Sequence, residues 1–251
     1  MNAPSTSRPH LFGLLAGLFL ATGLCFASLV LARAWTRIAE SSAINVTGSA
    51  RKNVRSDLVV WHANFSVDAP TLLEAQQQLH ADLAKVTAFL GARGLAEFTA
   101  QPVQIREITA KRRNEANDDE SVVTVRVGYR LTQWIEVRSA DVERLPRMAG
   151  ETGELLQQGV AFVSADMQFI YTKAGDAKIE MMAEATKDAR TRAEQIAAQG
   201  GGVIRELRAA KMGVVQINPL YSSSTSWEGN NDTSSVEKTI TATIAATFTL
   251  K

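Results

Sequence analysis

The sequence predicts an α+β fold, mostly antiparallel sheet with packed helices, preceded by one N-terminal transmembrane helix. An uncharged run of 22 residues, Leu11–Ala32, stands ahead of the rest of the chain. After it, segments with apolar residues at every second position alternate with amphipathic segments of helical period. Most of the strand-like segments come in adjacent pairs, which is typical of antiparallel pairing. The predicted order of strands and helices is ββαββαβαββ.

The uncharged run could either anchor the chain or direct its export. A helix of this length, rising about 1.5 Å per residue, covers the ~30 Å hydrocarbon core of a bilayer. The run is longer than the ~7–15 apolar residues usual in a cleavable signal peptide, yet small residues at Ala27 and Ala34 leave cleavage open. We therefore divide the chain into a tail at 1–10, a transmembrane anchor or signal segment at 11–32, a linker at 33–43 and a folded domain at 44–251.

Charge and cysteine content exclude several classes of function. The chain has 27 Lys and Arg against 26 Asp and Glu, and Arg8 is the one charged residue before residue 33. The remainder is therefore formally neutral and a poor electrostatic match for nucleic acid. The single cysteine, Cys25, lies inside the uncharged run. The folded domain consequently has no disulfide, thiolate metal site or cysteine nucleophile.

The stretch INVTGSARKNVRSD, residues 44–57, holds a glycine and basic residues that could suggest a phosphate-binding loop. Such a loop needs a helix directly after its glycine, and no helix is expected before Thr71. We expect a short strand at INVTGS, a polar turn at SARKNVR and a second strand from Ser56. Alternation in that second strand predicts a core-facing side made of Val59, Trp61, Ala63, Phe65 and Val67.

The middle of the chain predicts two helices around a hairpin. Apolar residues at helical spacing indicate a helix at 71–92 that ends at Gly91 and Gly94; they are Leu72, Leu79, Leu83, Val86 and Leu90. Strands at 102–113 and 121–137 should pair as an antiparallel hairpin through the polar link RRNEANDDES, and we expect the tip of this hairpin to be mobile. Ser139 is expected to cap a helix at 140–158.

The last third predicts a strand at 164–173, a helix at 176–199, a strand at 202–217, a long flexible loop at 218–235 and a final strand. The helix has a mostly small inner side made of Met182, Ala185, Ala189, Ala193 and Ile196. In the final strand the predicted core face is Val236, Ile240, Ala242, Ile244, Ala246, Phe248 and Leu250. Its predicted outer face is Glu237, Thr239, Thr241, Thr243, Thr247 and Thr249.

Three stretches resemble the SIMPL-domain family. They are INVTGSARKNVRSDLVVWHANFSV, VRVGYRLTQWIEVRSADVERL and DARTRAEQIAAQGGGVIREL, and the resemblance covers residues 44–251. Two positions depart from the family pattern: Ala50 stands where a second glycine is common, and Ser56 where proline is usual. The family includes periplasmic immunogenic proteins, proteins linked to oxidative-stress defence and a eukaryotic branch tied to kinase signalling.

The resemblance implies a bacterial envelope location and ring-like self-assembly, and it implies no established reaction. We therefore expect a single-pass inner-membrane protein with its C-terminal domain in the periplasm. Cleavage of the N-terminal segment would instead leave a soluble periplasmic protein. Arg8 lies on one side of the apolar run, and Arg33 and Arg37 on the other. The positive-inside rule therefore barely discriminates between the two orientations.

Candidate site residues are few, and we expect no catalytic, cofactor-binding or metal-binding residues. His10, His62 and His80 have no convincing partner in the sequence, and surface or interface roles are favoured for the last two. The acidic run NDDES at 117–121 does not match the spacing of an EF-hand loop. Acidic residues on the 176–199 helix recur every four positions among basic ones, which indicates a solvated helix face; they are Glu180, Glu184 and Asp188.

The leading hypothesis is a non-enzymatic, membrane-tethered periplasmic protein that acts by self-assembly or by binding an envelope partner in stress protection. The Thr-rich outer face of the final strand has two interpretations: a solvent face in the middle of one sheet, or a contact between copies, since open strand edges recruit other chains. The first rival is a periplasmic enzyme with an unrecognised site. The second is an adaptor that binds a membrane protein through the 218–235 loop, which carries Tyr221 and Trp227.

Overall fold

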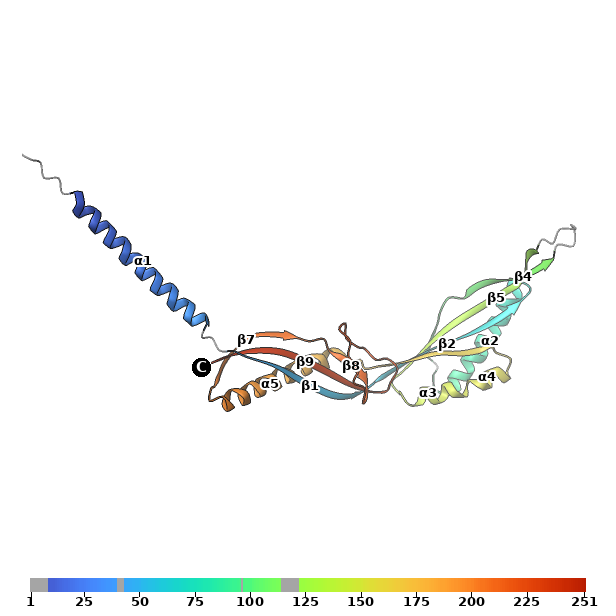
Figure 1. Ribbon diagram of the computed structural model, residues 1–251. Coiled ribbons are helices and arrows are strands. Elements are labelled where there is room, and N and C mark those ends of the chain that lie inside the picture. Colours follow the sequence, from blue (N-terminus) through green and yellow to red (C-terminus); the bar gives the residue numbers. More distant parts are fainter. Residues whose placement is uncertain (1–8, 40–42, 96, 114–121) are drawn as a thin grey trace, which may run out of the picture. The chain divides into compact units, whose positions relative to one another are not determined.

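A computed structural model describes residues 9–39, 43–95, 97–113 and 122–251 (Figure 1). The first element, α1, is a helix at Pro9–Ala39. Its segment Gly13–Trp35 is long and apolar enough to cross a membrane. By length and composition it fits either a membrane anchor or a signal sequence, so the predicted N-terminal apolar helix is confirmed and the choice between anchor and signal stays open.

The α+β fold class is also confirmed, and the folded part contains two antiparallel sheets. The first sheet has the order β1-β9-β7, and β8 also pairs with β9. Its strands are β1 (Ala43–Arg55), β7 (Ile204–Met212), β8 (Gln216–Pro219) and β9 (Glu237–Leu250). On β9 the predicted core face is buried at Ile240, Ala242, Ile244, Ala246 and Phe248. Because β9 is paired on both sides, its outer face lies in the middle of a sheet, which is one of the two interpretations that the sequence left open.

β1 is one continuous strand, so the predicted turn at SARKNVR is wrong. The residues of β1 that face inward include Gly48 and Ala50, which carry little or no side chain and therefore hide the apolar alternation. Gly48 lies so close to the helix α5 (Ala174–Gln199) that an added Cβ would sit 2.1 Å from the Ala185 carbonyl oxygen. The chain turns at Ser56 and Asp57, and a strand follows, which agrees with the rejection of a phosphate loop.

α5 buries an inner side that differs partly from the predicted one. Ile196, which was expected on this side, is 52% exposed, and Met182 is only half-buried. The buried residues recur every four positions along the helix: Ala177, Met181, Ala185, Ala189, Ala193 and Ala197. This row of mostly alanine side chains is what allows α5 to approach the sheet closely at Gly48.

The predicted strand at 202–217 is two strands, β7 and β8, separated at Gly213. A Cβ at Gly213 would lie 2.3 Å from the Thr243 hydroxyl. The Gly213 backbone N–H donates to the Thr243 carbonyl at 2.9 Å. The close approach of Thr243 therefore requires glycine at this position, and the ladder is interrupted there before β8 resumes pairing with β9.

The second sheet has the order β3-β5-β2-β6, and β4 also pairs with β5. Its strands are β2 (Leu58–Ala69), β3 (Phe98–Ala100), β4 (Gln104–Arg113), β5 (Val122–Ser139) and β6 (Phe162–Ile170). The predicted core face of β2 is confirmed, since each of its five residues is at most 9% exposed. The β4–β5 hairpin is also confirmed, whereas its tip at 114–121 lies outside the described residues. The short strands β3 and β8 are missing from the predicted order.

Helix α2 (Leu72–Ala92) packs on the second sheet against β2 and β5, near the predicted bounds. Thr71 caps it: its hydroxyl accepts from the Glu74 N–H, and the Glu74 carboxylate accepts from the Thr71 N–H. This capping box satisfies two donors that a helix start otherwise leaves open. The helix is followed by Gly94, whose φ is +74°. Of the predicted apolar residues, Leu72 is 41% exposed and lies outside the core.

The single helix predicted at 140–158 is instead three short pieces. These are α3 (Arg144–Ala149), the 3-10 turn η1 (Gly150–Thr152) and α4 (Gly153–Gln157). Ser139 does not cap a helix, because its hydroxyl accepts from the Asp141 N–H. The Asp141 carboxylate accepts from the Arg144 N–H at 2.9 Å, where α3 begins. Glycine at positions 150 and 153 weakens helix formation between the pieces.

Contacts divide the chain into two compact units, each described by itself below. The first unit comprises Met1–Ser49, Ala185–Gly213 and Thr243–Lys251. The second unit comprises Ala50–Glu184 and Val214–Ala242.

Candidate functional site

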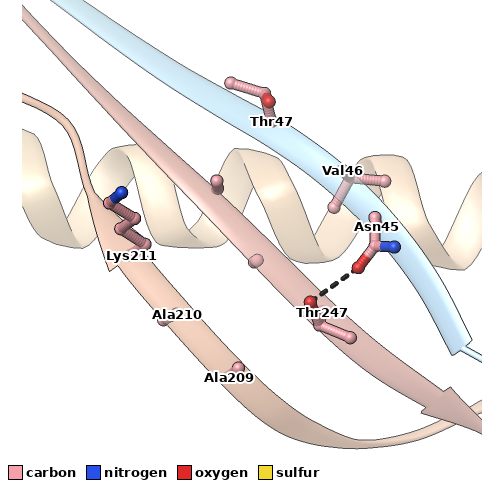
Figure 2. A pocket seen from close by; sticks show the side chains of 9 residues that line it. Asn45, Val46, Thr47, Ala209, Ala210, Lys211 and Thr247 are labelled. Carbon is pink, nitrogen blue, oxygen red and sulfur yellow. Dashed lines mark hydrogen bonds between the residues drawn. The ribbon is translucent and has the colours of Figure 1, made fainter.

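The face of the first sheet that points away from α5 is open to solvent within the first unit. Five residues from three strands are exposed there: Asn45 and Thr47 of β1, Ala245 of β9, and Ala209 and Lys211 of β7, of which all but Lys211 have short, uncharged side chains. They line a shallow groove of about 330 Å³. Figure 2 labels Asn45, Thr47, Ala209 and Lys211 and shows the helix behind the strands. In the middle of this sheet, the outer face of β9 is exposed at Ala245 and half-buried at Thr243 and Thr247.

Residues of this face contact or lie opposite one another on neighbouring strands. The Thr247 hydroxyl donates to the Asn45 side-chain oxygen at 2.6 Å (Figure 2). On the other side of β9, Ala209 lies opposite Thr247 and Lys211 lies opposite Ala245. Lys211 is the one charged residue among those that line the groove. We refer to Asn45, Thr47, Ala209, Ala245 and Thr247 together as the open face.

The outer side of β9 is not exposed along its whole length. Thr239, in the second unit, is only 4% exposed, and its hydroxyl donates to the Asn53 side-chain oxygen at 3.0 Å. The burial of Thr239 therefore excludes the N-terminal end of β9 from the predicted Thr-rich outer face. The sequence could not reveal this limit, because threonine recurs at every second position from Thr239 to Thr243 without a change of pattern.

His62 has two carboxylate partners that the sequence did not reveal. Its Nδ1 lies 3.1 Å from Asp166 Oδ1 on β6, and its Nε2 lies 3.5 Å from Glu136 Oε2 on β5. The three residues are register partners across adjacent strands. Arg138 also donates to Glu136, at 2.5 Å. Among the described residues, no group of three or more His, Cys, Asp or Glu side chains is suited to hold a metal ion.

Replacing His62 by Gln is expected to change the free energy of unfolding by no more than about 1 kcal/mol, because partly exposed ion pairs contribute about 0–1 kcal/mol. His80, which is exposed on α2, gives a matched His→Gln control. Thermal unfolding of both single variants and of the double variant at pH 7 measures the effect. A loss of several kcal/mol confined to His62→Gln would show that this row of charges holds the sheet together.

Two of the three predicted acidic residues of α5, Glu180 and Asp188, pair with neighbours, and no metal-ligand cluster is found among the described residues. Asp188 accepts from the Ser49 backbone N–H at 2.8 Å and from Arg192 at 2.9 Å. These two contacts, the Ser49 N–H foremost, hold the pKa of Asp188 below its usual value. Glu180 accepts from Lys52 at 2.6 Å. The predicted local pairing is confirmed for Asp188 and Arg192, and contacts between α5 and β1 add to it.

A buried ion pair in the second unit was missed by the sequence reasoning. Lys238 is 1% exposed on the face of β9 that otherwise carries core residues. Its Nζ donates to the Asp232 carbonyl at 2.7 Å and to the Asp232 carboxylate at 2.9 Å. The signal was present in the sequence, since a lysine interrupts the apolar side of the final strand between Val236 and Ile240.

Asp232 is held by further donors from its own loop. Its carboxylate accepts from the backbone N–H and the hydroxyl of both Ser234 and Ser235. Burial alone would raise the pKa of Asp232, but the hydrogen bonds from Lys238, Ser235 and Ser234 outweigh it and place the pKa far below the usual carboxyl value. The carboxylate is therefore ionised at neutral pH, and its charge is offset inside the protein.

The loop predicted to be flexible is tied to β8 by side-chain amides. Gln216 donates to the Ser226 carbonyl at 2.7 Å, and Asn218 donates to the Ser224 carbonyl at 2.6 Å. Both amides are buried. Two aromatic residues of the loop, Tyr221 and Trp227, remain 94% and 85% exposed. These bonds were not predictable from the loop's composition.

The chain consists of an N-terminal apolar helix followed by an α+β domain with two antiparallel sheets. The model of the SIMPL family, described as a protein of unknown function (DUF541), matches residues 44–248, and the chain belongs to this family. The resemblance seen in the sequence is thereby confirmed. A comparison with curated proteins finds no match. Family membership supports an envelope-associated protein without an assigned reaction.

Proposed function

We propose that this protein is a non-enzymatic, membrane-tethered periplasmic protein that acts by self-assembly through its open face. The observation that carries the proposal is the asymmetry of the first sheet. One side of the sheet is packed against α5, while the other carries the short, uncharged side chains of the open face, of which four are exposed and Thr247 is half-buried. Lys211 is the one charged side chain beside them in the groove. A role in stress protection is carried over from the family resemblance.

The chemistry of the open face suits contact with a second copy. Alanine, threonine and asparagine lose little side-chain entropy on burial compared with long charged side chains. Their small size also lets two sheets approach closely. A membrane anchor at α1 would confine the copies to one surface and raise their effective concentration, which favours weak contacts.

Adaptor activity is the second candidate, favoured by the two exposed aromatics of the 218–235 loop. Tyr221 and Trp227 are large apolar side chains that are almost fully exposed. Aromatic residues are enriched in the centres of protein interfaces. The loop belongs to the second unit and the open face to the first, so the two candidates are tested by substitutions at different residues.

The double change Thr47→Arg and Ala245→Arg should shift the full-length protein in detergent toward monomer. Both residues are exposed on the open face, and a symmetric contact would bring the four added charges together in a poorly solvated space. The measurement is light scattering coupled to size-exclusion chromatography at several micromolar protein. The matched control is Gln195→Arg with Ala198→Arg, two exposed positions on α5. An oligomer that survives the first pair of changes would exclude the open face as the contact.

A further inference from the structure

The second unit contains a pocket that none of the functions above uses. It has a volume of about 370 Å³. It lies where the end of β6, the beginning of α5 and the loop segment 231–233 meet. The loop is joined to β6 by the Phe169 N–H, which donates to the Thr233 carbonyl at 2.8 Å. This volume is at the lower end of the range for small-molecule sites, about 300–1,000 Å³.

The walls of the pocket are apolar on one side and polar on the other. Phe169, Ile170, Tyr171 and Ile217 supply the apolar side. These four side chains are buried or half-buried. The polar side is supplied by Asn231, Thr233, the Lys238–Asp232 pair and Lys178. A ligand that matches both walls of the pocket has an apolar body and one polar end.

The charge expected at the polar end of the ligand follows from how the ionic groups of the pocket are already paired with one another. Five hydrogen bonds from Lys238, Ser234 and Ser235 reach the Asp232 carboxylate. That carboxylate is therefore a poor partner for a cationic ligand. Lys238 donates to Asp232 twice, and an ammonium group carries three N–H donors. Lys178, exposed on α5, adds a second ammonium group to the lining.

We propose that this pocket binds a small organic carboxylate with an aromatic or branched aliphatic body. The apolar walls take the body of the ligand. Its carboxylate accepts from Lys178 and from the remaining N–H of Lys238. A neutral ligand of the same shape forfeits the charge-assisted hydrogen bonds, which are roughly twice as strong as neutral ones. A cationic ligand meets the ammonium groups instead.

The test uses 3-phenylpropionate and its neutral isostere 3-phenylpropanamide on the full-length protein in detergent. Isoleucine methyl groups are labelled with ¹³C, because Ile170 and Ile217 line the pocket and the exposed Ile105 lies outside it. We expect saturable shifts at the first two methyl groups and none at Ile105. The amide should bind about tenfold more weakly, because it forfeits the charge-assisted hydrogen bonds to the ammonium groups.

Two variants with matched controls complete the test. Lys178→Gln should weaken binding of the carboxylate severalfold and leave the amide unchanged, whereas Lys187→Gln, at an exposed position further along α5, should alter neither. Ala174→Leu, which fills the pocket, should abolish binding of both probes, and Ala198→Leu should not. The proposal is overturned if the pocket methyl groups show no saturable shift, if the amide binds as tightly as the carboxylate, or if Lys178→Gln has no effect.

Discussion

Replacing Asp232 by Ala should lower the free energy of unfolding by about 3–5 kcal/mol, because removing one partner of a buried pair leaves an uncompensated charge. The charge left behind is the ammonium group of Lys238, which is 1% exposed. The change also removes the acceptor that Ser234 and Ser235 share. For a chain of this size the melting temperature should fall by roughly 10 °C. Intrinsic fluorescence during heating measures it on the full-length protein.

Glu228→Ala is the matched control for Asp232→Ala, because Glu228 is an exposed acid of the same loop. Its effect should stay within about 0.5 kcal/mol. Adding Lys238→Met to Asp232→Ala should recover part of the lost stability, because the buried charge is then removed. A melting temperature for Asp232→Ala equal to that of the control would contradict the buried pair.

The same pair predicts a dependence on pH. The pKa of Asp232 is lowered in the folded protein, so its stabilisation is complete above the pKa of an unfolded Asp, about 4. It is lost as the pH falls below that value toward the folded pKa. The difference in stability between wild type and Asp232→Ala should therefore be constant from pH 5 to 8 and shrink below pH 4.

Gly48→Ala should be the most damaging single-methyl change in the first unit. The added Cβ would lie 2.1 Å from the Ala185 carbonyl oxygen and 2.4 Å from the Ala189 backbone nitrogen. Both are backbone atoms of α5, so the clash is relieved only by moving the helix off the sheet. Overpacking of a core costs about 1–3 kcal/mol and occasionally more, and we expect the upper end of this range or beyond.

Gly91→Ala provides the control for Gly48→Ala. Gly91 lies in α2, and an added Cβ there meets nothing within 4 Å. Because Ala is favoured over Gly in helices by up to about 1 kcal/mol, this control should be neutral or stabilising. Chemical denaturation of both variants, followed by circular dichroism, compares them directly. If Gly48→Ala is as stable as Gly91→Ala, β1 and α5 do not lie as close as described.

Elements whose own residues carry a clear period could be predicted from the sequence. The core faces of β2 and β9 and the helix α2 follow directly from spacing, and the apolar helix α1 follows from composition. β1 was misread because Gly48 and Ala50 take the inward positions, and small residues give no hydrophobic signal. Their significance depends on α5, which lies more than a hundred residues later in the chain.

Contacts between side chains were harder to predict from the sequence than the helices and strands themselves. His62 meets Glu136 and Asp166 only because β5 and β6 flank β2 in one register. Lys238 and Asp232 are close in sequence, yet their pairing depends on how the loop folds against β8 and β6. The outer threonines of β9 were recognised, whereas the burial of Thr239 against Asn53 needed the order of the strands.

Native mass spectrometry of the full-length wild-type protein, released from detergent at micromolar concentration, tests self-assembly through the open face most directly. We predict a defined multiple of the 27.2 kDa subunit mass. The Thr47→Arg, Ala245→Arg variant should appear at the single-subunit mass under the same conditions, and the α5 control should match wild type. A wild-type protein found only at the mass of one subunit would contradict the proposal.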